Sequence, residues 1–171
     1  MWSRLLTSAV LIVALISLTP SALIAHEENL PSSSVLLEIV DQTSGGKEVA
    51  FQLDLQALEA LESREIVTST LWTNGINRFK GVPLTQLLSA YNIEGSQLRL
   101  LANNDHAADI PLDDALNQHA LLAYRMNGSE MSRRGKGPLW IVYPFDQSAR
   151  FRTETVYARS VWQLNKIEVI D

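Results

Sequence analysis

The sequence predicts an α+β domain with a mixed β-sheet and short helices. Short runs rich in β-branched and apolar residues outnumber the segments that have apolar residues at helical spacing. The helical segments are brief, and two of them begin at a proline. The 171-residue chain contains no cysteine, so a hydrophobic core must hold the fold together without disulfides. Together these features indicate the α+β class.

The N-terminal residues 1–25 are typical of a signal peptide. Arg4 supplies a positive start, residues 5–17 form an apolar core, and residues 20–25 form a proline-led exit of small residues. An uncleaved membrane anchor is the alternative, but a bilayer span needs about 20 apolar residues. We therefore expect cleavage after Ala25, export to the periplasm and no stable membrane anchor afterwards.

The remaining chain has the length of one domain. Residues 26–34 are polar and broken by Pro31, which predicts a flexible leader, and the domain is expected to span residues 35–171. The net charge is −5 and becomes −6 when the signal peptide takes Arg4 away. A mildly acidic protein lacks the basic face that nucleic-acid binding requires, so that class of partner is excluded.

Seven runs are predicted strands. Residues 42–47, with their paired glycines, suit a hairpin loop between the first two runs, and Asn127 with Gly128 gives a strong hairpin signal after the fifth. The seven runs are residues 35–40, 48–53, 65–72, 97–102, 121–126, 139–143 and 161–170.

Three segments are predicted helices. Asp54 is placed to cap a helix over residues 55–61. Prolines suited to a first turn begin the segments 83–91 and 111–116. In the last of these, Asp113 and Asp114 favour the positive end of the helix, so we interpret them as structural charges and not as catalytic acids.

The segment 133–144 carries the strongest candidate for ligand binding. Three cations, Arg133, Arg134 and Lys136, alternate with two glycines and run into an apolar strand. Guanidinium groups and backbone amides at a strand entrance can form a cradle for a phosphate or carboxylate. The alternative is an ordinary solvated turn between strands.

Two polar loops supply the other candidate residues. Trp72, Thr73 and Asn74, with Asn77 nearby, form a polar turn with one aromatic ring that could orient a small ligand. Asp105 and His106 form the other expected lip of the pocket, although both loops also suit structural turns. Alternation along an extended segment would put Asp105 and Asp109 on one face and His106 on the other, so we predict no metal site.

The chain resembles the molybdopterin-binding domain of the sulfite-oxidase type. The likeness covers about residues 35–169 and looks closest to a short, exported, cysteine-free branch of that family. It implies a sulfite-oxidase-type fold and a molybdopterin cofactor. Four blocks carry it: residues 70–75, 79–88, 104–112 and 122–144.

The chain departs from that family where the cofactor would be held. Members of the family bind molybdenum through a cysteine thiolate, and aligning the turn glycine on Gly75 puts Thr73 at that position. A threonine hydroxyl stays protonated and is a hard, weak ligand. A Lys-Trp pair before the last strand is replaced by Trp162 and Gln163, which removes a positive charge, and His106 stands where tyrosine is common.

The sequence therefore predicts non-redox binding of a small anionic ligand or of a partner such as a periplasmic or membrane sensor protein. We assign no catalytic or metal-ligating residue, and the cofactor stays open because the resemblance and the missing cysteine disagree. Two alternatives remain: an active molybdenum-pterin oxidoreductase that holds its cofactor without a thiolate, and a structural or interaction domain. The predicted ligand-binding residues are Trp72, Thr73, Asn74, Asp105, His106, Arg133, Arg134 and Lys136.

Overall fold

The computed structural model describes residues 34–43, 48–117 and 119–171, which belong to one compact unit. The predicted signal peptide, most of the predicted leader and the middle of the predicted loop 42–47 lie outside the described residues. Within the part described, no helix is both long enough and apolar enough to span a bilayer.

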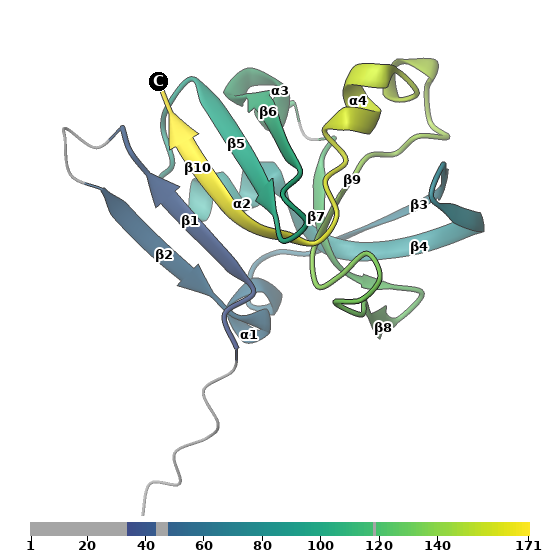
Figure 1. Ribbon diagram of the computed structural model, residues 1–171. Helices are drawn as coiled ribbons and strands as arrows, with labels where there is room; N and C mark the ends of the chain where they lie inside the picture. Colours follow the sequence, from purple (N-terminus) through teal and green to yellow (C-terminus); the bar gives the residue numbers. More distant parts are fainter. Residues whose placement is uncertain (1–33, 44–47, 118) are drawn as a thin grey trace, which may run out of the picture. The chain divides into compact units, whose positions relative to one another are not determined.

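The first of two five-stranded sheets contains both chain ends of the domain (Figure 1). Its strand order is β2-β1-β10-β5-β6. Strand β1 pairs with β10 in parallel and the other neighbours are antiparallel, so the sheet is mixed, as predicted. The strands are β1 (Leu37–Asp41), β2 (Val49–Leu53), β5 (Gln97–Ala102), β6 (Ala107–Pro111) and β10 (Leu164–Ile170).

The second sheet is antiparallel and has the order β3-β4-β7-β8, with β9 paired to β7. The register between β4 and β7 shifts at Lys80 and Gly81. A Cβ atom at Gly81 would collide with the carbonyl oxygen of Leu122, so this close approach requires glycine. The strands are β3 (Arg64–Thr70), β4 (Thr73–Pro83), β7 (Leu121–Met126), β8 (Ser129–Glu130) and β9 (Trp140–Val142).

The helices are short, as predicted. The Asp54 carboxylate accepts a hydrogen bond from the Ala57 amide at 2.7 Å and caps the first helix. Pro83 and Pro111 directly precede the second and third. The helical elements are α1 (Leu55–Glu59), α2 (Leu84–Ala90), α3 (Leu112–Leu116), α4 (Glu154–Ala158) and the single 3₁₀ turn η1 (Ala149–Phe151).

Several elements differ from the sequence prediction. Strand β4 covers eleven residues, so Asn77, which we predicted in a turn, lies within a strand opposite Thr68. Cross-strand pairing with β3 outweighs the polar composition of this segment. The predicted alternation from Asp105 to Asp109 does not hold either, because Asp105 has a φ of 62° in a turn and β6 begins only at Ala107.

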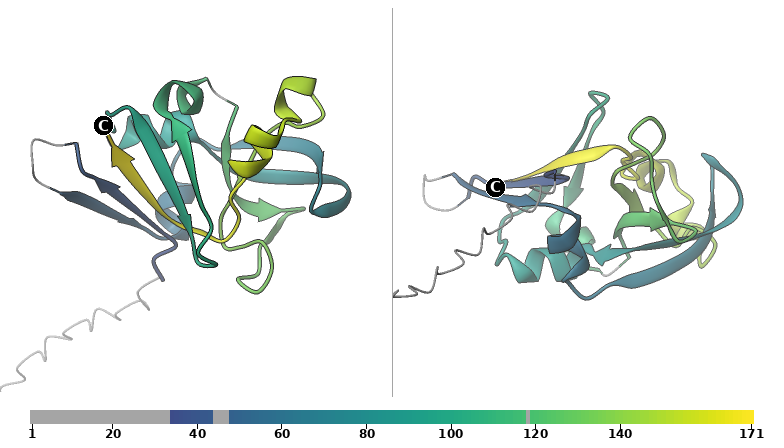
Figure 2. Two further views of the ribbon diagram at one scale, coloured as in Figure 1. Left: turned by 45° about the horizontal axis from the view of Figure 1, so that its top comes forward. Right: turned by 90° about the horizontal axis from the view of Figure 1, so that it is seen from below.

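The core contains the inward faces of both sheets. Trp140 and Phe79 are fully buried at its centre, and Tyr124 is 2% exposed. Helix α2 buries Leu84, Leu87 and Leu88 in the same cluster. The views in Figure 2 show α4 and the segment before it at the end of the second sheet, away from α1. The loops that contain the predicted site residues surround this core.

Candidate functional site

The basic loop uses its backbone amides internally. The Ser132 carbonyl accepts hydrogen bonds from the amides of Gly135 and Gly137 at 2.9 and 3.0 Å. The Ser132 hydroxyl accepts from the Arg134 amide at 3.2 Å. These three amides are therefore not available to a ligand, and the amide half of the predicted cradle is not supported.

Gln163 holds the same loop from the other side. Its side-chain amide donates to the carbonyls of Arg133 at 3.2 Å and Gly135 at 2.8 Å. Its backbone amide donates to the Lys136 carbonyl at 3.1 Å, and its φ of 55° sets this approach. The loop is thus fixed against the start of β10.

The three cations of the loop point to different surroundings. The Arg133 guanidinium donates to the Ser34 hydroxyl at 3.4 Å. The Lys136 ammonium lies 3.5 Å from the centroid of the Trp162 ring, and burial lowers the pKa of Lys136. Arg134 is exposed. Their charges do not converge on one point.

Trp72 packs in a cluster of aromatic rings beside Lys136. Its centroid lies 5.3 Å from that of Trp162 and 5.9 Å from those of Trp140 and Tyr157. Trp140 is fully buried, and its indole nitrogen donates to the Ser160 carbonyl at 3.2 Å. These edge-on contacts fix the half-buried Trp72 ring against the core.

The polar start of β4, directly after Trp72, is satisfied by its own hydrogen bonds. The Thr73 hydroxyl lies 2.8 Å from the Thr70 hydroxyl and accepts from the Asn77 side-chain amide at 3.0 Å. The same Asn77 nitrogen also donates to the Asn74 carbonyl at 3.2 Å. Asn127 donates to the Asn77 oxygen at 2.8 Å and ties the turn to the β7–β8 hairpin. Thr73 therefore has a structural role here.

Asp105 and His106 line a separate cavity of about 380 Å³. The His106 Nε2 atom lies 3.3 Å from the Ala158 carbonyl, a contact in which the imidazole donates. Lys166 in the same cavity pairs with Glu168 at 3.0 Å, and Glu38 adds another carboxylate. With its lysine paired and two carboxylates in its lining, this cavity does not favour an anion.

Each of the three loops that contain predicted residues nevertheless contacts one segment, residues 157–163. Tyr157 contacts Trp72, Ala158 contacts His106, and Trp162 contacts Lys136. Gln163 holds the basic loop, and its carbonyl accepts from the Asn103 amide at 3.0 Å. The three loops selected from the sequence thus meet at one segment, but Arg133 lines one cavity and Asp105 and His106 line another.

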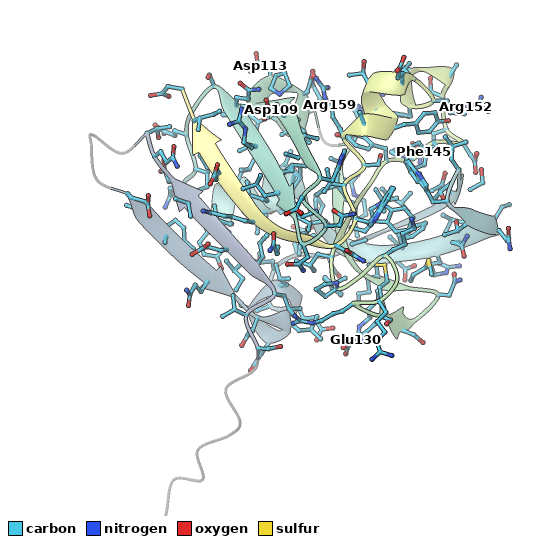
Figure 3. All side chains as sticks on the ribbon, in the orientation of Figure 1. Asp109, Asp113, Glu130, Phe145, Arg152 and Arg159 are labelled. Carbon is cyan, nitrogen blue, oxygen red and sulfur yellow. The ribbon has the colours of Figure 1, made fainter. Side chains whose placement is uncertain are left out.

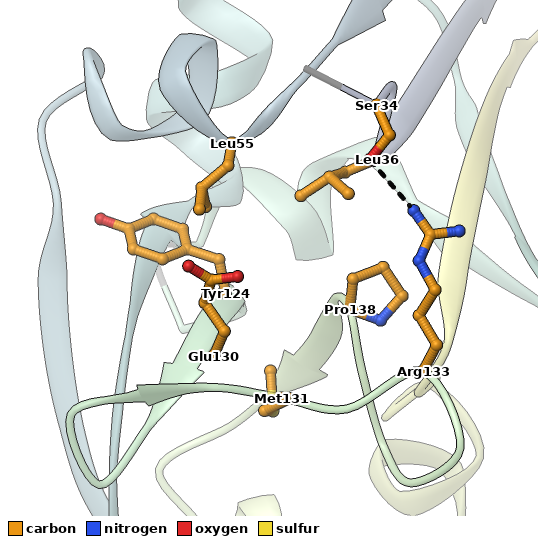
Figure 4. Close-up of a pocket in the computed structure, with 8 residues that line it drawn as sticks. All are labelled: Ser34, Leu36, Leu55, Tyr124, Glu130, Met131, Arg133 and Pro138. Atoms are coloured by element: carbon orange, nitrogen blue, oxygen red, sulfur yellow. Dashed lines mark hydrogen bonds between the residues drawn. The ribbon is translucent and has the colours of Figure 1, made fainter. Parts of the chain in front are cut away.

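Arg133 lines a cavity of about 220 Å³ at the edge of α1 and β7 (Figure 4). Its walls are mostly apolar and include Leu36, Leu55, Met131 and Pro138, and Tyr124 forms one side. Figure 4 shows the Arg133 guanidinium directed toward Ser34 across the mouth of the cavity from Glu130. Of the three cations of the basic loop, Arg133 is the one that lines this cavity.

Sequence reasoning missed a further cavity, of about 400 Å³, that contains Arg150, Arg159, His119 and Tyr143. These residues come from the α3–β7 connection, the end of β9, η1 and α4, so no local motif marks them. The only sequence signal is a set of three arginines, Arg150, Arg152 and Arg159, in the polar stretch 148–159 beyond β9.

The sequence matches the family described as oxidoreductase molybdopterin binding domain over residues 37–171. No curated protein sequence matches the chain.

The residues present do not fit a thiolate-ligated molybdenum centre. The chain has no cysteine, and the hydroxyl of Thr73 is already held by Thr70 and Asn77. Among the described residues, no group of three or more histidine, aspartate or glutamate side chains is placed to bind a metal ion. The thiolate ligand of such a centre is therefore missing from this chain.

Proposed function

Because the chain belongs to the oxidoreductase molybdopterin-binding domain family, we propose that it is a non-redox member that binds a small anionic ligand. The environment of Thr73 carries the proposal. A thiolate at that position would bind the metal, whereas the threonine hydroxyl is weak as a ligand and is engaged within its own turn. The fold is kept and its chemistry is replaced by binding.

The cavity beside Arg133 suits this ligand best. Among the described residues Arg133 has no carboxylate partner, and its bond to Ser34 at 3.4 Å is long. A cation at the mouth of an apolar cavity favours a carboxylate that carries a small apolar group. Glu130 at the same mouth lies 3.6 Å from Arg125 and disfavours a second negative charge. The expected ligand is a small monocarboxylate.

The composition of residues 1–25 supports a proposed cellular role. A signal peptide over residues 1–25 would export the domain, and a ligand-binding domain without redox chemistry suits a sensing or accessory component in the periplasm. A periplasmic or membrane sensor protein is the partner that this role implies.

Replacing Arg133 tests the proposed site. Butyrate is a suitable probe, with 1-butanol as the uncharged control, and calorimetry measures the affinity. Charge-assisted hydrogen bonds contribute about 1.5–3 kcal/mol, so Arg133→Ala should weaken butyrate binding roughly tenfold or more.

Arg134→Ala is the matched control, because it removes the same charge from the next residue, which does not line the cavity. It should change the affinity less than about twofold at moderate salt. Equal losses in both variants, or no butyrate binding by the unaltered protein, would refute this site.

A further inference from the structure

The cavity missed by sequence reasoning lies apart from the residues of the proposed carboxylate site. Arg150 and Phe151 line it from η1, Arg159 from α4, and Tyr143 from the end of β9. His119 closes it from the connection between α3 and β7. In Figure 3, Arg159 lies on the side of α4 that faces β6, whereas Arg152 lies on the opposite side.

The charges in this cavity are unbalanced. Arg159 pairs with Asp114 at 2.7 Å, which neutralises one positive charge. Arg150 instead donates to the Nε2 atom of His119 at 3.0 Å. An imidazole that accepts at Nε2 is neutral, so it cannot compensate the guanidinium charge. Within the described residues, Arg150 has no carboxylate partner.

Tyr143 adds a hydroxyl group to the same cavity. Its side chain lines the cavity and is mostly buried, with 6% of the residue exposed. Burial raises the pKa of Tyr143 to about 12, so the hydroxyl keeps its proton throughout the physiological range. The hydroxyl can therefore donate a hydrogen bond to an anion in the cavity that Tyr143 lines.

The geometry points to a second anion site in this cavity, which takes a phosphate-type oxyanion, either inorganic phosphate or the phosphate group of a small monoester. Arg150 and Arg159 supply the guanidinium donors that match such an oxyanion, and the Tyr143 hydroxyl supplies a third donor. The site shares no residue with the carboxylate site beside Arg133 and does not depend on it.

The pKa of His119 should change when an anion binds, so it provides a measure of binding at this site. Arg150 and the Phe151 ring face it from η1, and Arg64 acts on it from β3. Burial, and then the charges of Arg150 and Arg64, lower the pKa of His119 below its usual value. An anion beside Arg150 would offset this positive field. Its binding should therefore raise the pKa of His119.

Imidazole NMR titrations of the purified protein with inorganic phosphate and with phenyl phosphate test the proposal. Both probes should shift the His119 signals and raise its pKa, while His106, which lines a different cavity, serves as the internal control. Tighter binding of phenyl phosphate would identify a monoester as the ligand class, and tighter binding of phosphate would identify the free ion. Either order supports the site.

Three variants make the test specific. Arg150→Ala should weaken phosphate binding roughly tenfold or more, and Tyr143→Phe should weaken it several-fold, because each removes a donor to the anion. Arg152→Ala removes the same charge two residues away from Arg150, outside the cavity, and should change the affinity less than about twofold.

The proposal fails if neither probe causes a saturable change at His119, or if Arg152→Ala weakens binding as much as Arg150→Ala. Failure here is separable from failure of the carboxylate site. Arg133→Ala should leave the His119 response intact, and Arg150→Ala should leave butyrate binding intact.

Discussion

Gln163 shows how one side chain fixes the arrangement of the basic loop. Its two side-chain hydrogen bonds and one backbone bond all end on carbonyl oxygens of residues 133–136. The loop therefore turns three carbonyls toward Gln163, while Arg134 is exposed and Lys136 packs over Trp162. Where the sequence pattern indicated only the loss of a neighbouring positive charge, the structure gives this glutamine a positive role in positioning Arg133 and Lys136.

Both Gln163→Ala and Gln163→Glu should lower the free energy of unfolding, and Gln163→Glu should lower it more. Gln163→Ala removes two hydrogen bonds, each with a net value of about 0.5–1.5 kcal/mol. Gln163→Glu keeps the shape but places a carboxylate against the carbonyls of Arg133 and Gly135, so at pH 7 it should be the less stable variant. Urea unfolding measures the order. Wild-type stability in Gln163→Glu would contradict this role.

Among the elements, β3 depends on a contact with the segment after β9. The Asp146 carboxylate accepts from the amide of Ser69 at 2.5 Å and from its hydroxyl at 2.8 Å. The Asp146 amide donates to the Thr68 hydroxyl at 3.1 Å. These bonds, led by that from the Ser69 amide, lower the pKa of Asp146. They connect the hairpin that contains Thr73 to the segment that leads to α4.

This contact should weaken in acid. The folded-state pKa of Asp146 is lowered, so its stabilising effect is complete above the unfolded pKa of about 3.9 and is lost as the pH falls through the folded value. Asp146→Asn should therefore be less stable than the wild type at pH 7, and the gap should shrink at acid pH. Urea midpoints across this range measure the gap.

Asp109, which lies in the other sheet, provides a matched control for Asp146. Its pKa is also lowered, in this case by a hydrogen bond from Arg99. Asp109→Asn should show the same pH trend without disturbing the contact between Ser69 and Asp146. A gap for Asp146→Asn that stays constant down to the acid limit would show that the carboxylate charge is not what holds β3.

For the whole molecule, the sequence predicted the elements whose signals are local. Buried apolar residues in β1, β5 and β10 and the prolines before α2 and α3 placed those elements within a few residues. Helix α4 buries none of its five residues, so it has no apolar periodicity to detect. The polar first half of β4 was missed because its extended form depends on pairing with β3.

The candidate site also depends on tertiary contacts that no local sequence pattern encodes. Sequence patterns identified the loops of Trp72, His106 and Lys136, and the structure places all three beside residues 157–163. The directions of these side chains depend on tertiary packing, such as the Trp162 ring under Lys136, and no local pattern encodes them. The Arg150 cavity joins four separate segments, which is why only the fold reveals it.

We propose that this family member lacks metal chemistry at Thr73, and the most direct test is its molybdenum and pterin content. The protein should be produced with residues 1–25 in place in a host that makes the cofactor, beside a cysteine-containing member of the family as a loading control. We predict that the control carries both components and that this protein carries neither. A molybdenum-to-protein ratio near one, accompanied by pterin and catalytic turnover, would contradict the account.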